Sequence, residues 1–419
     1  MAREERVASE YRSWVAVALW IVILLLTVPL ARTLQGHVRS ILGDTSFGYM
    51  VITIVSISSI YLIFRLNHTV EKLKPTRVIW ILLCAIFLIA YTISLWGNPI
   101  EAVHFVQYGI LAGLLFIALS WRYSNKLIYI AIILATTIVG ILDESLQWLI
   151  PNRVWGLSDI AVNTLASIII CIAIAKGIRP KLVTQPTDQK STQLIFRLSI
   201  TCISLLLLSF SNTPDTIAWY SERVSPLLFL SKNSHIMAEY GYRYNDETIG
   251  LFRSRFSPEE LRKVDVERAI EAAGKLDTSP LLEDYKEFIT RYSPITDPFL
   301  HELRVHLNRR DYYLKTAQQT QRYSDQEQRR RFRIAYFENK IVEKYFSNTL
   351  EISLFQLNQT DNELMSEKLI DRSYYNSPVS ESLITLLSKR QLLTLLALVL
   401  FGLIVLNFKF MSSTPTRLY

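Results

Sequence analysis

The sequence is poor in cysteine, with three in 419 residues. Cys84, Cys171 and Cys202 all lie in apolar runs, which excludes a disulfide framework and argues against a cysteine-based metal site. Acidic residues are scarce in the first half: residues 1–211 carry 10 Asp and Glu, whereas residues 212–390 carry 27. This uneven distribution excludes a single soluble globular domain and a disordered chain. The chain instead joins an apolar, basic half to a water-soluble segment.

Eight apolar runs are close in length to the roughly 20 residues that a helix needs to cross a bilayer. They are Trp14–Leu30, Phe47–Phe64, Val78–Trp96, Val103–Trp121, Leu127–Leu142, Ile160–Ala175, Leu194–Phe210 and Leu392–Phe408. Each must be helical in hydrocarbon, because only a helix satisfies its own backbone there. We interpret the first run as an uncleaved helix. The alternative is a cleaved signal peptide, which the preceding acids and the lack of a small-residue cleavage site disfavour.

The distribution of Lys and Arg among the short loops predicts the orientation, because cytoplasmic loops are enriched in these residues. With the N-terminus in the cytoplasm, the inner segments hold fifteen Lys and Arg, and the short outer loops hold three, Arg32, Arg39 and Arg153. We therefore expect a multi-pass protein of the cytoplasmic (inner) membrane. Both termini would be cytoplasmic and residues 212–390 extracytoplasmic.

The expected fold class is an all-α polytopic membrane protein, a helical membrane bundle with a mainly helical extracytoplasmic domain inserted before the last transmembrane helix. The expected boundaries are 1–46 for the N-terminal tail and first helix, 47–176 for the main membrane domain, 177–211 for a linker and the seventh helix, 212–390 for the extracytoplasmic domain, and 391–419 for the last helix and tail. Helical patterns cover about 258–275, 279–291, 296–320 and 324–348, and Ser257 is a good N-cap. No strong strand pattern is visible.

Four acids in the first half share one predicted depth, at the outer ends of spans four to six: Glu101, Asp143, Glu144 and Asp159. His104 and Tyr108 follow Glu101 at helical spacing, and Gln147 follows Glu144. Ser158 is a candidate cap for span six, and Pro151 should end span five. Carboxylates at helix ends can simply face water, but ionisable groups at membrane depth usually mark a site. We expect an outer-leaflet pocket in which Arg153 pairs with Glu144 or Asp159, and His104 bonds Glu101 or Glu144.

Three strings in this region resemble the signature of VanZ-like membrane proteins. They are His104-Phe105-x-x-Tyr108, Glu144-x-x-Gln147-x-x-x-Pro151-x-Arg153 and Asp159-x-x-x-Asn163, and the resemblance covers roughly residues 47–176. It implies an integral protein of the bacterial envelope, and the founding member is associated with low-level resistance to the glycopeptide teicoplanin. Relatives often carry glycines after the last Asn, where this chain has Thr164-Leu165-Ala166-Ser167, so looser helix packing is expected there.

Two features of the soluble segment attract attention and are interpreted as structural. His301 and His306 stand at i and i+5, not the i and i+4 of a zincin helix, so no metal site is expected. The cluster Arg329-Arg330-Arg331-x-Arg333 resembles a site for anionic lipid, but Asp325, Glu327 and Glu338 should balance it. Nucleic acid is not an expected partner of a domain outside the cell, and no cofactor is expected.

Two functions from different classes are consistent with the sequence. In the first, the pocket binds a lipid-linked or amphiphilic envelope ligand, a precursor or a glycopeptide, through Glu101, His104, Tyr108, Glu144, Gln147, Arg153, Asp159 and Asn163. In the second, the protein is a membrane enzyme that acts on a lipid-linked envelope precursor, with Glu144 and His104 as the acid–base pair. A transporter is disfavoured, because the acids lie near one end of the spans. The ligand, any catalysis and the oligomeric state are left open.

Overall fold

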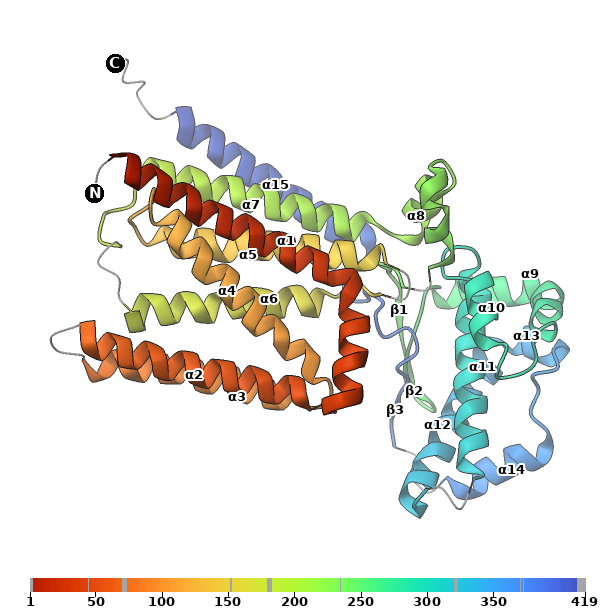
Figure 1. Ribbon diagram of the computed structural model, residues 1–419. Helices are drawn as coiled ribbons and strands as arrows, with labels where there is room; N and C mark the ends of the chain where they lie inside the picture. The colour runs from red at the N-terminus through yellow and green to blue at the C-terminus, as the bar shows by residue number, and fades with distance from the viewer. Residues whose placement is uncertain are drawn as a thin grey trace. The chain divides into compact units, whose positions relative to one another are not determined.

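The computed structural model describes residues 3–43, 45–69, 74–150, 153–178, 183–233, 235–319, 323–369, 371 and 373–412. Within these ranges, eight helices are long and apolar enough to cross a membrane, and each coincides with one of the eight apolar runs (Figure 1). The prediction of an all-α polytopic membrane protein is therefore confirmed. The chain divides into two compact units, Met1–Leu208 with Leu395–Tyr419, and Ser209–Thr394. We call them the membrane unit and the inserted unit.

The membrane unit is built around α4, which packs against α1, α2, α5 and α6. Its elements are α1 (Arg3–Leu42), α2 (Ser46–Thr69), α3 (Pro75–Ser94), the 3-10 helix η1 (Pro99–Ala102), α4 (Val103–Leu119), α5 (Leu127–Trp148), α6 (Leu157–Ile172) with its π-helical extension η2 (Ala173–Ile178), α7 (Gln189–Ser211) and α15 (Lys389–Ser412). Tyr108, Leu111 and Ala112 of α4 are fully buried. In contrast, no described residue of α15 is buried, so its surface suits contact with lipid.

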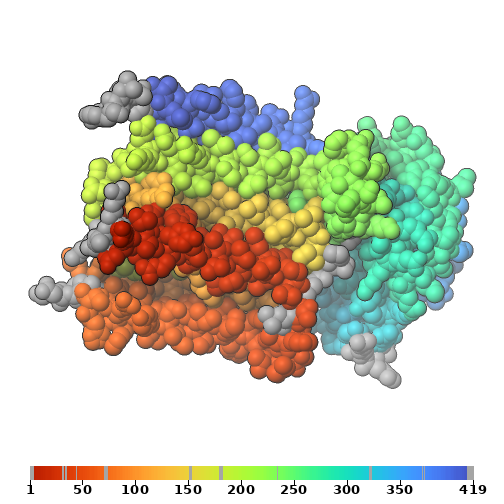
Figure 2. All heavy atoms as spheres, turned by 45° about the horizontal axis from the view of Figure 1, so that its top comes forward, coloured from red at the N-terminus to blue at the C-terminus, as the bar shows by residue number. Residues whose placement is uncertain are grey.

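Helix α1 differs from a simple membrane span. α1 is 40 residues long, contains Pro29, and turns across the bundle in its second half (Figure 1). Proline explains such a bend, because it removes a backbone hydrogen bond and clashes with the preceding turn. α7 lies beside α15 (Figure 2), and the rings of Phe196 and Phe410 are 6.0 Å apart.

The inserted unit is mainly helical, as the sequence predicted. Its elements are α8 (Pro214–Ser221), the 3-10 segment η3 (Ser225–Lys232), β1 (Tyr242–Asp246), β2 (Gly250–Ser254), α9 (Pro258–Asp277), α10 (Tyr285–Arg291), α11 (Pro298–Ala317), α12 (Asp325–Tyr345), α13 (Ser347–Ile352), α14 (Gln359–Lys368) and β3 (Tyr375–Asn376). The four predicted helices correspond to α9, α10, α11 and α12. Ser257 and Glu260 form the expected capping box at the start of α9. The core includes Phe252, Leu303 and Ile341.

The three short strands correct the expectation that this segment has no strand pattern. β1 and β2 form an antiparallel hairpin, and β3 pairs with β2 in parallel. Gly250 is required at the β2–β3 contact, because its φ is +118° and a Cβ there would lie 2.1 Å from the Tyr375 carbonyl oxygen. The alternation was hidden because an inward-facing residue of β1 is Asp246, which is buried and accepts hydrogen bonds from Lys344 and Tyr345, both at 2.6 Å.

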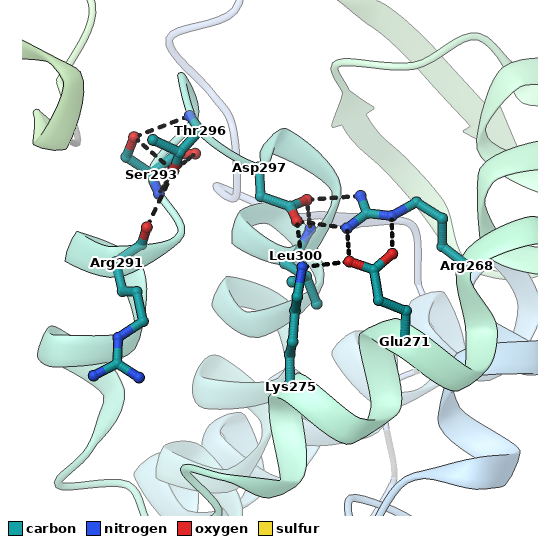
Figure 3. Close-up of polar contacts among 8 residues, drawn as sticks. All are labelled: Arg268, Glu271, Lys275, Arg291, Ser293, Thr296, Asp297 and Leu300. Carbon is teal, nitrogen blue, oxygen red and sulfur yellow. Dashed lines mark hydrogen bonds and ion pairs between the residues drawn. The ribbon is translucent and has the colours of Figure 1, made fainter.

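An ion-pair cluster joins α9 to the beginning of α11 (Figure 3). Arg268 donates to Asp297 at 2.8 Å and to Glu271 at 3.1 Å. Asp297 is also the N-cap of α11 and accepts from the Leu300 backbone N–H at 3.2 Å. Lys275 lies 3.8 Å from the same carboxylate. The cluster therefore caps the start of α11 and joins it to α9.

The chain enters and leaves the inserted unit through adjacent segments. Ile384 donates from its backbone to the Glu239 carbonyl at 2.8 Å and accepts from Gly241 at 3.0 Å. Lys389, at the start of α15, donates to the Thr213 hydroxyl at 2.8 Å. The half-buried Arg255 side chain donates to Glu239 at 2.9 Å and to Ser380 at 3.3 Å, so it contacts both connecting segments.

Candidate functional site

A cavity of about 550 Å³ lies where several helix ends meet on one side of the membrane unit. Sequential helices run in opposite directions, so the ends of α1 and α5 meet the beginnings of α2, α4 and α6 there (Figure 1). The cavity is lined by Leu24, Thr27, Val28, Gln35, Arg39, Phe47, Asn98, Ile100, Glu101, Val103, His104, Gln107, Asp143, Gln147, Arg153 and Asp159.

Charged groups of both signs line this cavity beside an apolar wall. Three carboxylates, from Glu101, Asp143 and Asp159, are accompanied by the guanidinium groups of Arg39 and Arg153. Apolar lining comes from positions such as Leu24, Val28 and Phe47. Ligand sites commonly combine a mostly apolar surface with a few convergent polar groups. The arrangement suits a polar group attached to an apolar one.

Asp143 is the buried carboxylate that faces the cavity. The Tyr108 hydroxyl, itself fully buried behind the lining, donates to Asp143 Oδ2 at 3.0 Å. Among the described residues, Asp143 Oδ1 has no hydrogen-bond partner. A buried acceptor without a partner is costly, so this oxygen retains an unused capacity to accept a hydrogen bond. Tyr108 therefore orients Asp143 and does not itself line the cavity.

Glu144, the next residue, is fully buried and does not line the cavity. Gln147 donates to its Oε1 at 2.8 Å, and the Gly156 backbone donates to its Oε2 at 3.0 Å. Glu144 therefore ties the end of α5 to the segment that leads into α6. No hydrogen bond joins Glu144 to His104 among the residues that the structure describes, so the expected acid–base pair is not assembled.

His104 lies at the start of α4, close to Asp143, Glu101 and Arg153, with which it interacts electrostatically. Its ring is 6.2 Å from that of Tyr108. Its Nδ1 atom is buried and makes no hydrogen bond within the described part of the chain. The expected neighbour Glu101 is present, but it lies in η1 rather than on the α4 face, and it accepts from Asn98 at 2.6 Å.

Arg153 and Asp159 both line the cavity, and Arg153 acts electrostatically on Asp159 and on Glu144. The sequence predicted Ser158 as the cap of α6, and this prediction is wrong. The N-cap is Gly156, and Ser158 lies within the first turn, where its hydroxyl is 3.4 Å from Asp159 Oδ1. Pro151, expected to end α5, lies outside the described residues.

Asn163 is fully buried one turn below Asp159 and does not line the cavity. It packs against Gly140 of α5, where an added Cβ would lie 3.3 Å from its side-chain nitrogen. At this point the small residue that allows α5 and α6 to approach each other is Gly140 of α5. Nearby on the same two helices, Thr137 and Thr164 are joined by a 2.9 Å hydrogen bond.

Of the eight predicted site residues, five line the cavity: Glu101, His104, Gln147, Arg153 and Asp159. Three lie behind it: Tyr108, Glu144 and Asn163. Sequence reasoning missed the contribution of α1, including Gln35 and Arg39, because the first apolar run was taken to end the helix. The one available signal was their i,i+4 spacing, which places both on one helix face.

The two other motifs of the sequence have structural roles in the inserted unit. His301 Nδ1 lies 3.1 Å from the Tyr292 carbonyl oxygen, and His306 Nδ1 lies 2.7 Å from Glu338. In the basic cluster, Arg330 and Arg331 pair with Glu327, and Arg333 pairs with Asp371. Glu338 was expected to balance that cluster, but it is buried with Arg309 and His306 instead.

In the part of the chain that the structure describes, no group of three or more His, Cys, Asp or Glu residues is arranged to hold a metal ion. Comparison with protein-family models, curated proteins and solved structures finds no match to this chain.

Proposed function

We propose that the cavity binds the polar head of an amphiphilic, lipid-linked ligand of the bacterial envelope. The observation that carries this proposal is the combination of a buried, incompletely satisfied Asp143 with an apolar wall of α1 in one cavity. A ligand with hydroxyl or amine donors satisfies the carboxylate, and its apolar chain extends along the wall. Arg153 and Arg39 offer charge-assisted hydrogen bonds to a phosphate or carboxylate of the same head.

The bias of Lys and Arg among the loops supports a cavity at the outer leaflet, with both termini in the cytoplasm. In that orientation the inserted unit is extracytoplasmic, on the same side as the cavity, in the cytoplasmic membrane of a bacterium. The VanZ-like motif and its link to teicoplanin resistance belong to this proposal, because five of the motif residues line or support the cavity: His104, Tyr108, Gln147, Arg153 and Asp159.

Native mass spectrometry of the protein in mild detergent tests the binding role. We expect a specific bound lipid or precursor in the wild type and at least a tenfold loss in Asp143→Asn and Arg153→Ala, since a charge-assisted hydrogen bond contributes about 1.5–3 kcal/mol. Thr137→Val is the matched control, because Thr137 is a polar α5 residue outside the cavity lining. Identical lipid in all four proteins would refute a specific site.

A second function, acid–base catalysis on a lipid-linked precursor, is favoured by the proximity of His104 to Asp143 at the cavity wall. In this alternative Asp143 takes the role that the sequence suggested for Glu144, whose two oxygens are already hydrogen-bonded. Membranes incubated with labelled precursor would release a product in the wild type and none in Asp143→Asn. If the wild type binds the precursor but releases no product, the catalytic function is refuted and the binding function is retained.

A further inference from the structure

A cluster of large apolar side chains is exposed on the segment that follows α7. In α8 and η3, Trp219 is 60% exposed, Leu228 55%, Phe229 45% and Val224 43%. The same segment also buries Ile217 and Leu230 completely in the inserted unit. The core of the unit therefore accounts for only some of its apolar residues. We call Trp219, Val224, Leu228 and Phe229 the interfacial face.

The chain keeps this face close to a membrane-spanning helix. Only Asn212 and Thr213 lie between the last residue of α7 and the first of α8. An extended chain covers at most about 3.5 Å per residue, so α8 begins within about 10 Å of the end of α7. The headgroup layer on each side of a bilayer is about 5–8 Å thick. α8 consequently begins at or beside the headgroup level.

The segment is hydrogen-bonded near both of its ends. Tyr220 donates to Asn212 at 3.2 Å, next to α7, and Ser293 donates to the Ser231 carbonyl at 2.7 Å, at the other end. The Arg223 guanidinium lies 4.9 Å from the centre of the Trp219 ring. Tryptophan and a cation with an apolar stem are the side chains suited to the boundary between acyl chains and headgroups.

A large apolar side chain is also exposed where the chain returns to the membrane. Leu386 stands three residues before α15 and is 90% exposed. Since Lys389 bonds Thr213, the residue before α8, the α8 and α15 ends of the inserted unit meet at one place. Exposed apolar side chains thus flank both points at which this unit joins membrane helices.

We propose that the interfacial face inserts into the headgroup–acyl boundary of the bilayer that α7 and α15 cross. Its partner is lipid. The proposal follows from the continuity of the face with two membrane helices and from its aromatic and aliphatic side chains. The formal charge of the segment from Pro214 to Lys232 is balanced, with two acids and two cations, so insertion depends on apolar burial and not on anionic lipid.

Spin labels on the full-length protein in phosphatidylethanolamine–phosphatidylglycerol vesicles test this proposal. Single cysteines replace Leu228 or Phe229 in a background with Cys84, Cys171 and Cys202 changed to Ala. The matched control is Lys286→Cys, an exposed polar site on α10 of the same unit. We expect labels at 228 and 229 to be accessible to oxygen and protected from a water-soluble nickel chelate, at a depth of about 5–10 Å. The control label should be accessible to nickel.

Two results would overturn the proposal. Labels at 228 and 229 as accessible to nickel as the control would place the face in water. Protection from both oxygen and nickel would mean that protein, and not lipid, covers it. Because each variant changes one exposed side chain and leaves Trp219 intact, misfolding of one does not affect the other, and hydrogen exchange in α11 reports whether each variant folds.

Discussion

Two buried carboxylates, Glu338 of the inserted unit and Asp143 of the membrane unit, differ in how completely their hydrogen bonds are satisfied. In the inserted unit, Glu338 is fully buried and accepts from His306, from Arg309 at 2.9 Å and from the Tyr375 and Ser377 hydroxyls at 2.6 and 2.8 Å. Although burial acts against its ionised form, His306, Tyr375 and Arg309 together lower the pKa of Glu338. These four side chains together compensate the negative charge of Glu338.

In the membrane unit, neutral groups hold the buried carboxylates. Tyr108 donates to Asp143, and Gln147 and the Gly156 backbone donate to Glu144. Asp143 lines the cavity, and its buried Oδ1 has no hydrogen-bond partner among the described residues. The fully paired Glu338 cluster stabilises the fold, whereas the incompletely paired Asp143 is the group to which the proposed function assigns a ligand.

Removing Glu338 should have the largest effect on stability. Glu338→Ala leaves His306 and Arg309 without their shared carboxylate, which typically costs about 3–5 kcal/mol. Hydrogen exchange of α11 and α12 in the full-length protein measures this loss. The matched control is Glu343→Ala on the same helix, a partly exposed carboxylate that pairs with Lys340 and accepts from Asn339, with an expected cost of about 1–2 kcal/mol. Equal effects of the two substitutions would break the comparison between the units.

The buried His301 should make the inserted unit sensitive to acid. Burial and the nearby Arg255 lower the pKa of His301 to about 3, from an ordinary value of 6.5. The unfolded chain then binds the extra proton below pH 6.5, so stability falls as the pH decreases from 6.5 towards 3, by about 1.4 kcal/mol per pH unit. In His301→Gln the hydrogen bond to Tyr292 can persist, and this slope should disappear when hydrogen exchange is compared at pH 6 and 5. An unchanged slope would assign the sensitivity to other groups.

Glu144→Gln should have a smaller effect, because its partners are neutral. The amide oxygen still accepts from Gly156, and Gln147 can rotate, so the expected cost is about 1 kcal/mol. Thermal unfolding of the membrane unit measures it, and native mass spectrometry should find ligand binding retained. Loss of ligand in Glu144→Gln with retention in Asp143→Asn would reverse the assignment of the cavity carboxylate.

The smallest effect is expected at the surface of α12. Arg330 is mostly exposed and pairs with Glu327, so Arg330→Ala should change stability by less than about 0.5 kcal/mol. Co-flotation of the same variant with anionic and with neutral liposomes measures its lipid binding. No difference from the wild type is expected. A clear loss of anionic-lipid dependence would give the basic cluster the lipid-binding role that its ion pairs argue against.

The membrane helices could be predicted well from sequence, because hydrocarbon permits only one backbone solution for an apolar run. The first helix is the instructive exception. Its apolar run stops at Leu30, yet the helix continues to Leu42 as a polar segment that turns across the bundle. Hydropathy reports burial in lipid and has no signal for a helix that leaves the hydrocarbon, so Gln35 and Arg39 were not assigned to the site.

The meeting of the acids could be predicted from their common depth, but the choice between Asp143 and Glu144 could not. Adjacent helical residues point about 100° apart, so only one of the two can face the cavity. Packing of α5 against the segment before α6 makes that choice, by offering the Gly156 N–H to Glu144. Such a contact depends on tertiary structure, and neither spacing nor residue type encodes it.

The hydrogen bond from Lys389 to Thr213 has a topological consequence. It joins positions 176 residues apart in the chain. A flexible loop of that length carries a closure entropy that increases with the logarithm of its length. The folded inserted unit removes this cost, because its own contacts bring its two ends together. For the neighbouring membrane helices, an insertion larger than many whole domains is thus equivalent to a short hairpin turn.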